Sequence, residues 1–367
     1  MWKHFRNLAL GCCVSLLCCE LVLRCLPVST STAFGYFVDP VILSYPAHHV
    51  FMASTGWDLR NAQVNQANNF GFVASHDFRP GDDAIGLIGD SYVESSMLPM
   101  NDRPAAQIER VLGGRLLYAM GAPGSALLDY VERVRWASQR FGTRDFILVL
   151  EEGDLWESIC GSGQSHGPCL DKQSLSPRIE KLPPPGLAKR ILRHLALAQY
   201  ISGQLKLDPS RLIAQARLQA RPPEPAEVER PAAVAEHRVS PGAREVAAKF
   251  LERLSALRPH RVLIVLDAHR EAIYAGLGPR TGADLELFAD MASTAGYDVL
   301  RTADALSADY AARHLSFDVG PYDHHLNALG WRIIARAIAD TWKPAAVATP
   351  ALAADAVQPP RQARAAP

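Results

Sequence analysis

The chain has 367 residues, and its 38 Lys and Arg balance its 38 Asp and Glu, so the formal net charge is zero. This length accommodates one large α/β domain with appendages. A nucleic-acid partner is not expected, because binding to phosphates requires an excess of Lys and Arg that this composition lacks.

The amino-terminal residues 1–27 have the pattern of a membrane-targeting segment. An apolar run at residues 8–23 follows a short leader that carries Lys, His and Arg. This order predicts either a signal peptide or an uncleaved anchor. We favour an inner-membrane anchor with the main domain exported to the periplasm; secretion after signal cleavage is the alternative. Glu20 and Arg24 are four residues apart and are expected to pair at the membrane edge.

Residues 28–80 are predicted to be a connector and amino-terminal extension, rich in aromatic residues, Asn and Gly. Its Trp57, Phe70 and Phe72 are interpreted as packing residues rather than as a platform for sugar rings.

Strand and helix patterns alternate through residues 81–342, which we predict to be the main domain. This alternation predicts a central parallel sheet of about five strands with helices on both faces, a flavodoxin-like three-layer α/β sandwich. The strands are expected after Ala84 and over Arg115 to Ala119, Phe146 to Leu150, Val262 to Asp267 and Asp298 to Leu300, with helices over Pro104 to Leu112 and Leu127 to Phe141.

An insertion interrupts this pattern at about residues 155–246. Its first half contains a predicted helix from Leu187 to Leu205, and its second half is rich in Pro and Ala and is expected to be flexible. The insertion is either a lid at the site or variable surface. The tail, residues 343–367, lacks periodicity and is predicted to be disordered.

Cys160 and Cys169 bracket a Gly-rich loop within the insertion, whereas the other five cysteines lie in the apolar leader. An even pair in an exported domain predicts a disulfide. The alternatives are two free thiols, or a metal site that adds His166 but lacks a fourth ligand at useful spacing.

A serine lies at the carboxyl end of the first predicted strand. Gly89 and Asp90 end the apolar run and leave Ser91 on the turn, where ligands bind in open α/β sheets. A nucleophilic serine needs an imidazole and a carboxylate, and Asp323 and His325 have the spacing to supply both. Alternatively, Asp90 and Ser91 only cap the next helix.

The segment that carries Asp323 and His325 precedes an amphipathic helical pattern, with Asn327 as its expected N-cap. Another interpretation of this segment is a metal-dependent phosphodiesterase that uses Asp90, His324 and His325. The sequence shows no carboxylate-rich cluster to accompany those residues.

Three motifs together resemble the SGNH/GDSL hydrolase superfamily. They are GDSYVES (residues 89–95), YAMGAPGS (residues 118–125) and DHHLNALG (residues 323–330). The resemblance implies the SGNH hydrolase fold, Ser91 as nucleophile, and an oxyanion hole formed by the amides of Ser91 and Gly124. It also implies that His325 is the general base and that Asp323 orients it.

One position departs from the family pattern. Gly153 occupies the place of the Asn whose side chain donates to the oxyanion. Loss of one such donor typically costs about 3 kcal/mol of transition-state stabilisation, or roughly 100-fold in rate. Either another donor substitutes, or the enzyme is slow, or catalysis has been lost. His269, after the fourth strand, is a candidate substrate contact or substitute donor, or else a structural histidine. Glu152 and Glu157 are expected to be poor donors when ionised, although they could bind sugar hydroxyls.

The resemblance implies an exported serine esterase that removes or transfers O-acyl groups, acetyl above all, on a carbohydrate or envelope glycan. It implies no cofactor and no metal ion. The alternative is a degenerate domain that binds glycans or acts as a scaffold in an envelope assembly, whose biosynthetic partners the sequence does not identify.

Overall fold

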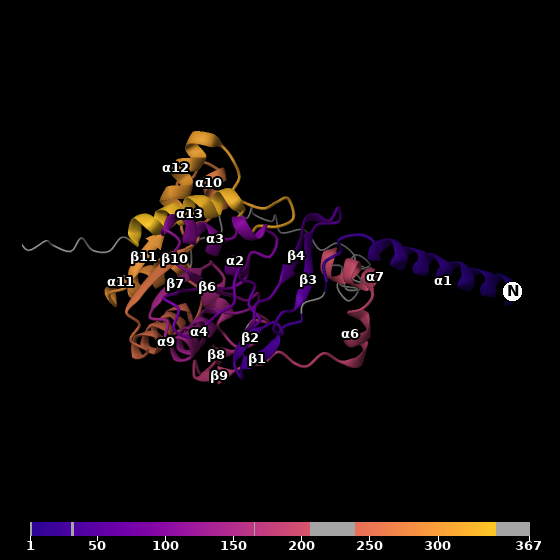
Figure 1. Ribbon diagram of the computed structural model, residues 1–367, viewed down its shortest axis with the longest axis horizontal. Coiled ribbons are helices and arrows are strands. Elements are labelled where there is room, and N and C mark those ends of the chain that lie inside the picture. Colours follow the sequence, from indigo (N-terminus) through magenta and orange to yellow (C-terminus); the bar gives the residue numbers. More distant parts are fainter. Residues whose placement is uncertain (1, 31–32, 165, 206–238, 343–367) are drawn as a thin grey trace, which may run out of the picture.

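The computed structural model describes residues 2–30, 33–164, 166–205 and 239–342. Its centre is a parallel sheet of five strands, as predicted (Figure 1). In spatial order the strands are β11 (Asp298–Arg301), β10 (Arg261–Leu266), β7 (Asp145–Leu150), β5 (Ile85–Gly89) and β6 (Leu117–Gly121).

Strands β5, β6 and β7 are buried along their whole length, which explains their nearly continuous apolar sequences. Alternate side chains enter opposite faces of the sheet. Ile85 and Leu87 of β5 belong to one core, whereas Ile88 belongs to the other. Two hydrophobic cores therefore lie on either side of one sheet.

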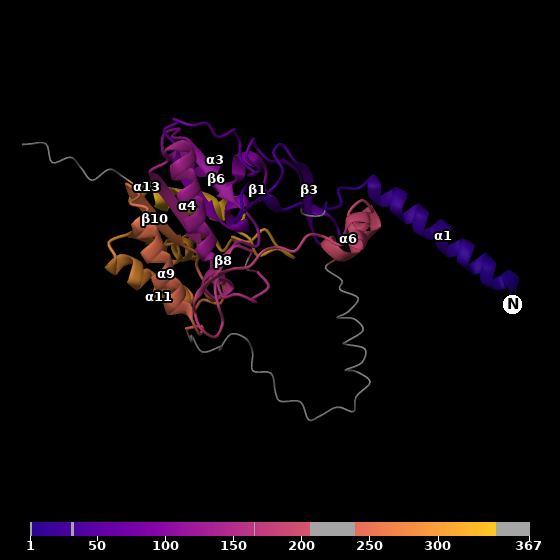
Figure 2. The same cartoon turned by 90° about the horizontal axis from the view of Figure 1, so that it is seen from below.

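Helices cover both faces, so the predicted three-layer sandwich is confirmed (Figures 1 and 2). One face is covered by α4 (Leu127–Phe141), α9 (Ala243–Ala256) and α11 (Ala283–Thr294). The other is covered by α3 (Pro104–Val111), α12 (Ala303–Arg313) and α13 (Ala328–Thr341). Asn327 caps α13 as expected, because its side-chain oxygen accepts from the amides of Leu329 and Gly330 at 2.9 and 3.0 Å.

Helix α1 (Trp2–Arg24) projects from this body, and none of its residues is buried (Figure 2). Among the described residues it is the one helix long and apolar enough to cross a membrane. Glu20 and Arg24 pair at 2.7 Å near its carboxyl end.

The amino-terminal extension contains two hairpins. The first pairs β1 (Gly35–Asp39) with β2 (Ile42–Ser44), and the second pairs β3 (Val50–Thr55) with β4 (Arg60–Gln66). Phe72 is buried in the main core and Phe70 packs against it. The expectation for Trp57 is wrong: it lies after β3 on the turn of the second hairpin and is 64% exposed.

The insertion contains several short elements. They are α5 (Asp154–Glu157), β8 (Pro168–Leu170), β9 (Pro177–Ile179), α6 (Leu187–Leu192), α7 (Ala196–Gln199) and the π-helix η2 (Tyr200–Gln204). The single helix predicted from Leu187 to Leu205 is wrong, because Leu195 is extended and α7 starts anew after it. Residues 206–238, which include the Pro/Ala-rich stretch of the insertion, and the tail, residues 343–367, lie outside the described residues.

Candidate active site

Ser91 is the first residue of α2 (Ser91–Glu94), directly after β5. Asp90 caps this helix by accepting from the amide of Tyr92 at 2.9 Å, so the capping interpretation holds for Asp90. A Cβ atom at Gly89 would lie 2.5 Å from a methyl group of Val93. Only glycine therefore allows α2 to pack this closely on the end of β5, which fixes the position of the serine.

The structure brings Ser91, His325 and Asp323 together from opposite ends of the domain. The Nε2 atom of His325 lies 2.8 Å from Oγ of Ser91, and Nδ1 lies 2.5 Å from Oδ1 of Asp323. An ionised carboxylate only accepts hydrogen bonds, so Nδ1 carries the proton and Nε2 can accept from the serine. This is the arrangement that activates a serine hydroxyl.

The environment of His325 changes its basicity in two opposing ways. Burial lowers the pKa of His325, but the hydrogen bond and the charge of Asp323 outweigh burial and raise it above its ordinary value. The imidazole is therefore a stronger base than a free histidine, and the imidazolium formed during proton transfer is stabilised.

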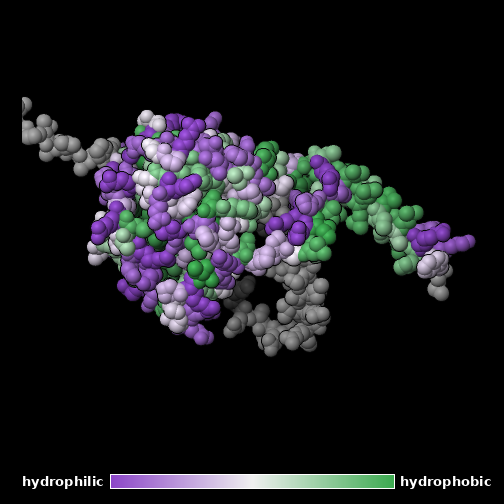
Figure 3. Space-filling model, turned by 60° about the horizontal axis from the view of Figure 1, so that its bottom comes forward, coloured by the Kyte–Doolittle hydropathy of each residue, from purple (hydrophilic) through white to green (hydrophobic). Residues whose placement is uncertain are grey.

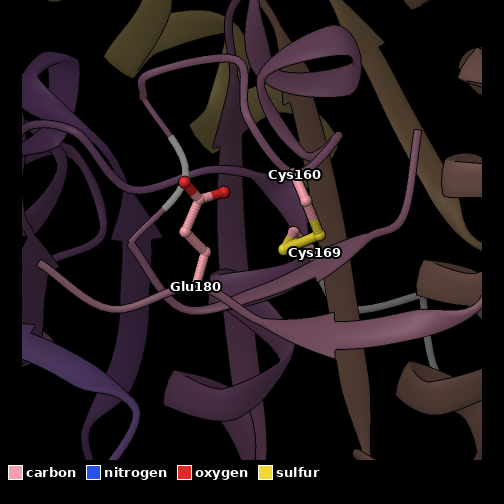
Figure 4. Close-up of side chains that lie close together, drawn as sticks. All are labelled: Cys160, Cys169 and Glu180. Carbon is pink, nitrogen blue, oxygen red and sulfur yellow. A yellow bond between two sulfur atoms is a disulfide. The ribbon is translucent and has the colours of Figure 1, made fainter.

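Both ring nitrogens of His325 are engaged by Asp323 and Ser91, so neither is available to a metal ion. The phosphodiesterase interpretation therefore has no support in this geometry. Cys160 and Cys169 form the predicted disulfide (Figure 4), which leaves no thiolate for the alternative of a metal site with His166. Near them, Glu180 accepts from the amide of Gly161 at 2.7 Å.

Arg270 holds the loop that carries the histidine, and sequence reasoning missed it. Its buried guanidinium donates to Asp267 at 2.7 Å, to Asp318 at 2.8 Å and to the hydroxyl of Tyr92 at 3.1 Å. It also donates to the backbone oxygen of His324, next to His325. One cation thus joins the end of β10, the helix of the serine and the histidine loop.

Gly124 and Gly153 follow β6 and β7, the two neighbours of β5. The carboxyl ends of parallel strands meet at one edge of the sheet, so both glycines belong to the same edge as Ser91. Gly124 has φ +74°, a conformation that favours glycine, and a Cβ atom there would lie 3.4 Å from the ring of His166.

The space of the missing Asn side chain is filled by carboxyl groups. A Cβ atom at Gly153 would collide with Oε1 of Glu151 and would lie 3.1 Å from Oε1 of Glu157. Glu151, Asp154 and Glu157 form a cluster whose carboxyl oxygens lie within 4.8 Å of one another. Buried like charges at such distances cannot all persist, so protons must be retained in the cluster.

The pKa values of this cluster agree with proton retention. Burial, followed by the charges of Asp90 and Glu157, raises the pKa of Glu151 to about 9. Burial and the charge of Asp90 raise the pKa of Glu157 to about 7, and the pKa of Asp154 is also raised. Asp154 already accepts from the Tyr130 hydroxyl at 2.7 Å and from the Glu151 amide at 2.9 Å. Glu151 is therefore a member of the cluster that can carry a proton at neutral pH.

His269 lies at the carboxyl end of β10, where it caps α10 (Arg270–Tyr274) by accepting from the amide of Ala272 at 3.2 Å. Its ring also borders a pocket shared with Glu151 and Glu152. The contact with α10 matches the structural interpretation of this residue.

A larger pocket of about 520 Å³ lies beside Asp323 and His325. Trp57 and Tyr322 form part of its wall, and Nε1 of Trp57 donates to the hydroxyl of Tyr322 at 2.9 Å. Gln204, in η2 of the insertion, supplies another part of the wall. An exposed indole therefore lies next to the candidate catalytic loop.

No family model and no curated protein matches this chain. Among solved structures it is similar to a member of the lipolytic protein G-D-S-L family from Veillonella parvula, at 14% identity and TM-score 0.36, covering 71% of this chain and 97% of that one. It is also similar to LAE5, an alpha/beta hydrolase from the metagenome of Lake Arreo in Spain (14%, TM-score 0.38, 72% and 96% covered). A two-domain esterase active on acetylated mannans gives 10% identity and TM-score 0.35, with 70% of this chain and 48% of that one covered. Likenesses this distant carry no inference about activity.

Proposed function

We propose that this chain is a serine esterase of SGNH/GDSL type that removes or transfers O-acyl groups through an acyl-serine intermediate. The observation that carries this proposal is the continuous hydrogen-bonded series from Ser91 through His325 to Asp323. A structural helix cap would need Asp90 alone and would not require an imidazole and a carboxylate aligned on the serine.

In the proposed reaction, Oγ of Ser91 attacks the ester carbonyl carbon while its proton moves to Nε2 of His325. The tetrahedral intermediate collapses when the ester bond breaks, and the departing alkoxide takes the proton from Nε2. Water, or a second hydroxyl in a transferase, then attacks the acyl-serine by the same route in reverse. Asp323 keeps the ring oriented throughout.

We propose that the amides of Ser91 and Gly124 bind the oxyanion together with the carboxylic acid of Glu151, in the space where the family has an amide. A protonated carboxyl group donates an O–H bond to the developing negative charge, whereas an ionised one would repel it. This assignment follows from the position of the Glu151 carboxyl against Gly153 and from its raised pKa.

The preferred substrate class is an O-acetylated carbohydrate of the cell envelope. Trp57 supports this preference, because its exposed indole beside the candidate loop offers a flat apolar surface to a sugar ring. We further propose that α1 anchors the chain in the inner membrane and that the main domain lies in the periplasm.

The test is turnover of p-nitrophenyl acetate and acetylated glycans by the purified full-length chain and its Ser91→Ala variant. We expect the variant to lose at least about 1,000-fold in kcat, since removal of a triad nucleophile abolishes the covalent route. Equal turnover by variant and parent would end the hydrolase proposal.

A second candidate is a non-catalytic glycan-binding or scaffolding domain. The observation that favours it is Gly153 at the Asn position, together with a second acceptor for the serine hydroxyl, Oδ2 of Asp90 at 3.2 Å. Under this candidate, the parent and Ser91→Ala would bind acetylated glycans equally well, and neither would hydrolyse them.

A further inference from the structure

Helix α7 and the turn that precedes it contact the carboxyl end of α1. The carboxylate of Glu20 accepts from the amides of Ala196 and Leu197 at 3.0 and 2.8 Å. Arg24 donates to the backbone oxygen of His194 at 3.0 Å. Glu20 therefore caps the amino terminus of α7, and Figure 1 shows α7 beside the last turns of α1.

Helix α6 exposes a row of large apolar side chains. Leu187 is 73% exposed, Ile191 57% and Leu192 50%. Leu187 and Ile191 are four residues apart and share a face. At 100° per residue, Lys189 lies opposite that face, whereas Arg190 and Leu192 lie on its two flanks. The helix is thus amphipathic, yet its apolar side has no covering in the described part of the chain.

The charge of this region differs from that of the whole chain. Residues 181–205, which we call the α6–α7 segment, contain four Lys and Arg and no Asp or Glu, although the chain as a whole is neutral. An uncovered apolar face flanked by basic residues, with no acidic ones, is typical of helices that lie in a membrane interface. The surface of α1 is also largely apolar, up to hydrophilic residues at its amino end (Figure 3).

We propose that the α6–α7 segment binds the surface of an anionic phospholipid bilayer, beside the point where α1 emerges from it. Leu187, Ile191 and Leu192 enter the boundary of the acyl chains. Lys189, Arg190 and Arg193 remain at the level of the lipid phosphates. We assign a bilayer as the binding partner because the α6–α7 segment is hydrogen-bonded to the Arg24 end of α1. When α1 spans the membrane, this end lies at the membrane surface.

The segment also connects the bilayer to the candidate site. Its last part, η2, donates from Gln204 to the backbone oxygen of Gly56 at 2.8 Å and from Tyr200 to that of Trp57 at 2.7 Å. Trp57 in turn donates to Tyr322, next to the catalytic loop. The mouth of the catalytic pocket is therefore held close to the membrane surface. This inference depends on the proposed anchoring by α1, and it goes beyond the proposed ester chemistry.

The experiment uses the full-length chain in proteoliposomes, with a genetically encoded, environment-sensitive fluorescent amino acid in place of Ile191. Leu277, which is 50% exposed on the loop after α10, receives the same probe as the matched control. Acyl-chain spin-labelled lipids report contact with the bilayer by quenching. In vesicles of phosphatidylcholine with phosphatidylglycerol, we expect quenching at position 191 to exceed that at position 277 by about threefold or more.

The charge requirement is tested by the combined Lys189→Glu, Arg190→Glu and Arg193→Glu variant and by vesicles of phosphatidylcholine alone. Both changes are expected to reduce quenching at position 191 to nearly the level measured at position 277. Equal quenching at positions 191 and 277 in anionic vesicles would overturn the proposal, as would a protein partner that covers position 191. Equal quenching in the two vesicle types would overturn the assignment to anionic lipid. Ser91→Ala is expected to quench like the parent, so esterase activity that is unchanged in this variant, with intact quenching at position 191, would count against the proposed function alone.

Discussion

Replacement of Glu151 by Ala tests how the site functions without the Asn of the family pattern. The change removes the carboxyl group that fills the space next to Gly153 and leaves the amides of Ser91 and Gly124 as donors. One oxyanion donor is worth about 3 kcal/mol, so kcat on p-nitrophenyl acetate should fall by roughly 100-fold with little change in KM. Glu151→Gln keeps an N–H donor in the same place and should remain within about tenfold of the parent.

A rescue experiment separates this role from a structural one. Gly153→Asn alone should impair the enzyme, because its Cβ collides with Oε1 of Glu151. Combined with Glu151→Ala, the collision is removed and the Asn restores the donor of the family pattern, provided that the Glu157 side chain, 3.1 Å from the added Cβ, shifts slightly. We expect kcat of the double variant to be at least about tenfold higher than kcat of Glu151→Ala. Glu152→Gln, on the neighbouring residue, is the matched control and should behave as the parent.

Activity is expected to fall at alkaline pH if Glu151 is an oxyanion donor. The donor is the protonated form of Glu151, so activity should be present below its raised pKa, about 9, and should fall as pH rises through that value. Glu151→Gln does not ionise and should lack this alkaline limb. The reasoning is refuted if Glu151→Ala is as active as the parent, or if Glu151→Gln is as impaired as Glu151→Ala.

Three further predictions concern the surroundings of the serine. Arg270→Ala leaves buried carboxylates without their cation, so the free energy of unfolding should fall by about 3–5 kcal/mol in urea titrations, and a loss below about 1 kcal/mol would contradict its positioning role. Trp57→Ala should raise KM for an acetylated glycan by about two- to tenfold and leave KM for p-nitrophenyl acetate unchanged, since one stacked ring is worth roughly 0.5–1.5 kcal/mol. Equal effects on both substrates would contradict a contact between Trp57 and the sugar. His325 acts as a base only when neutral, so activity should rise as pH rises through its raised pKa. Asp323→Asn removes the charge that raises the pKa of His325, so kcat should fall and the rise of activity at acid pH should move to lower pH. If that rise does not move, the titrating group is not His325.

The sheet and the triad residues were predictable because their signals are local. Apolar runs such as that of β7 produce buried parallel strands, and the turn after Gly89 places a hydroxyl at a strand end whatever the rest of the chain does. The closeness of Ser91 and His325, 234 positions apart, came from a resemblance and not from periodicity.

Three features of the structure could not be predicted from the sequence because they depend on contacts between distant segments. Arg270 reaches Tyr92, which is 178 positions away, and nothing in the local sequence marks it. The break before α7 results from capping by Glu20, 176 positions earlier, which overrides a continuous helical pattern. The sequence did not mark Glu151 as a candidate donor, because its burial among other carboxyl groups, which favours the protonated form, depends on the folded structure.

The most direct measurement is labelling of the full-length chain by a fluorophosphonate probe, with the modified residue located by peptide mass spectrometry. An activated serine reacts quickly and an ordinary one does not. We predict a single adduct on Ser91 that is abolished in Ser91→Ala and slowed by about 1,000-fold or more in His325→Ala. An unlabelled parent, or labelling of Ser91 that is as fast without His325, would contradict the claim that these two side chains form a working catalytic pair.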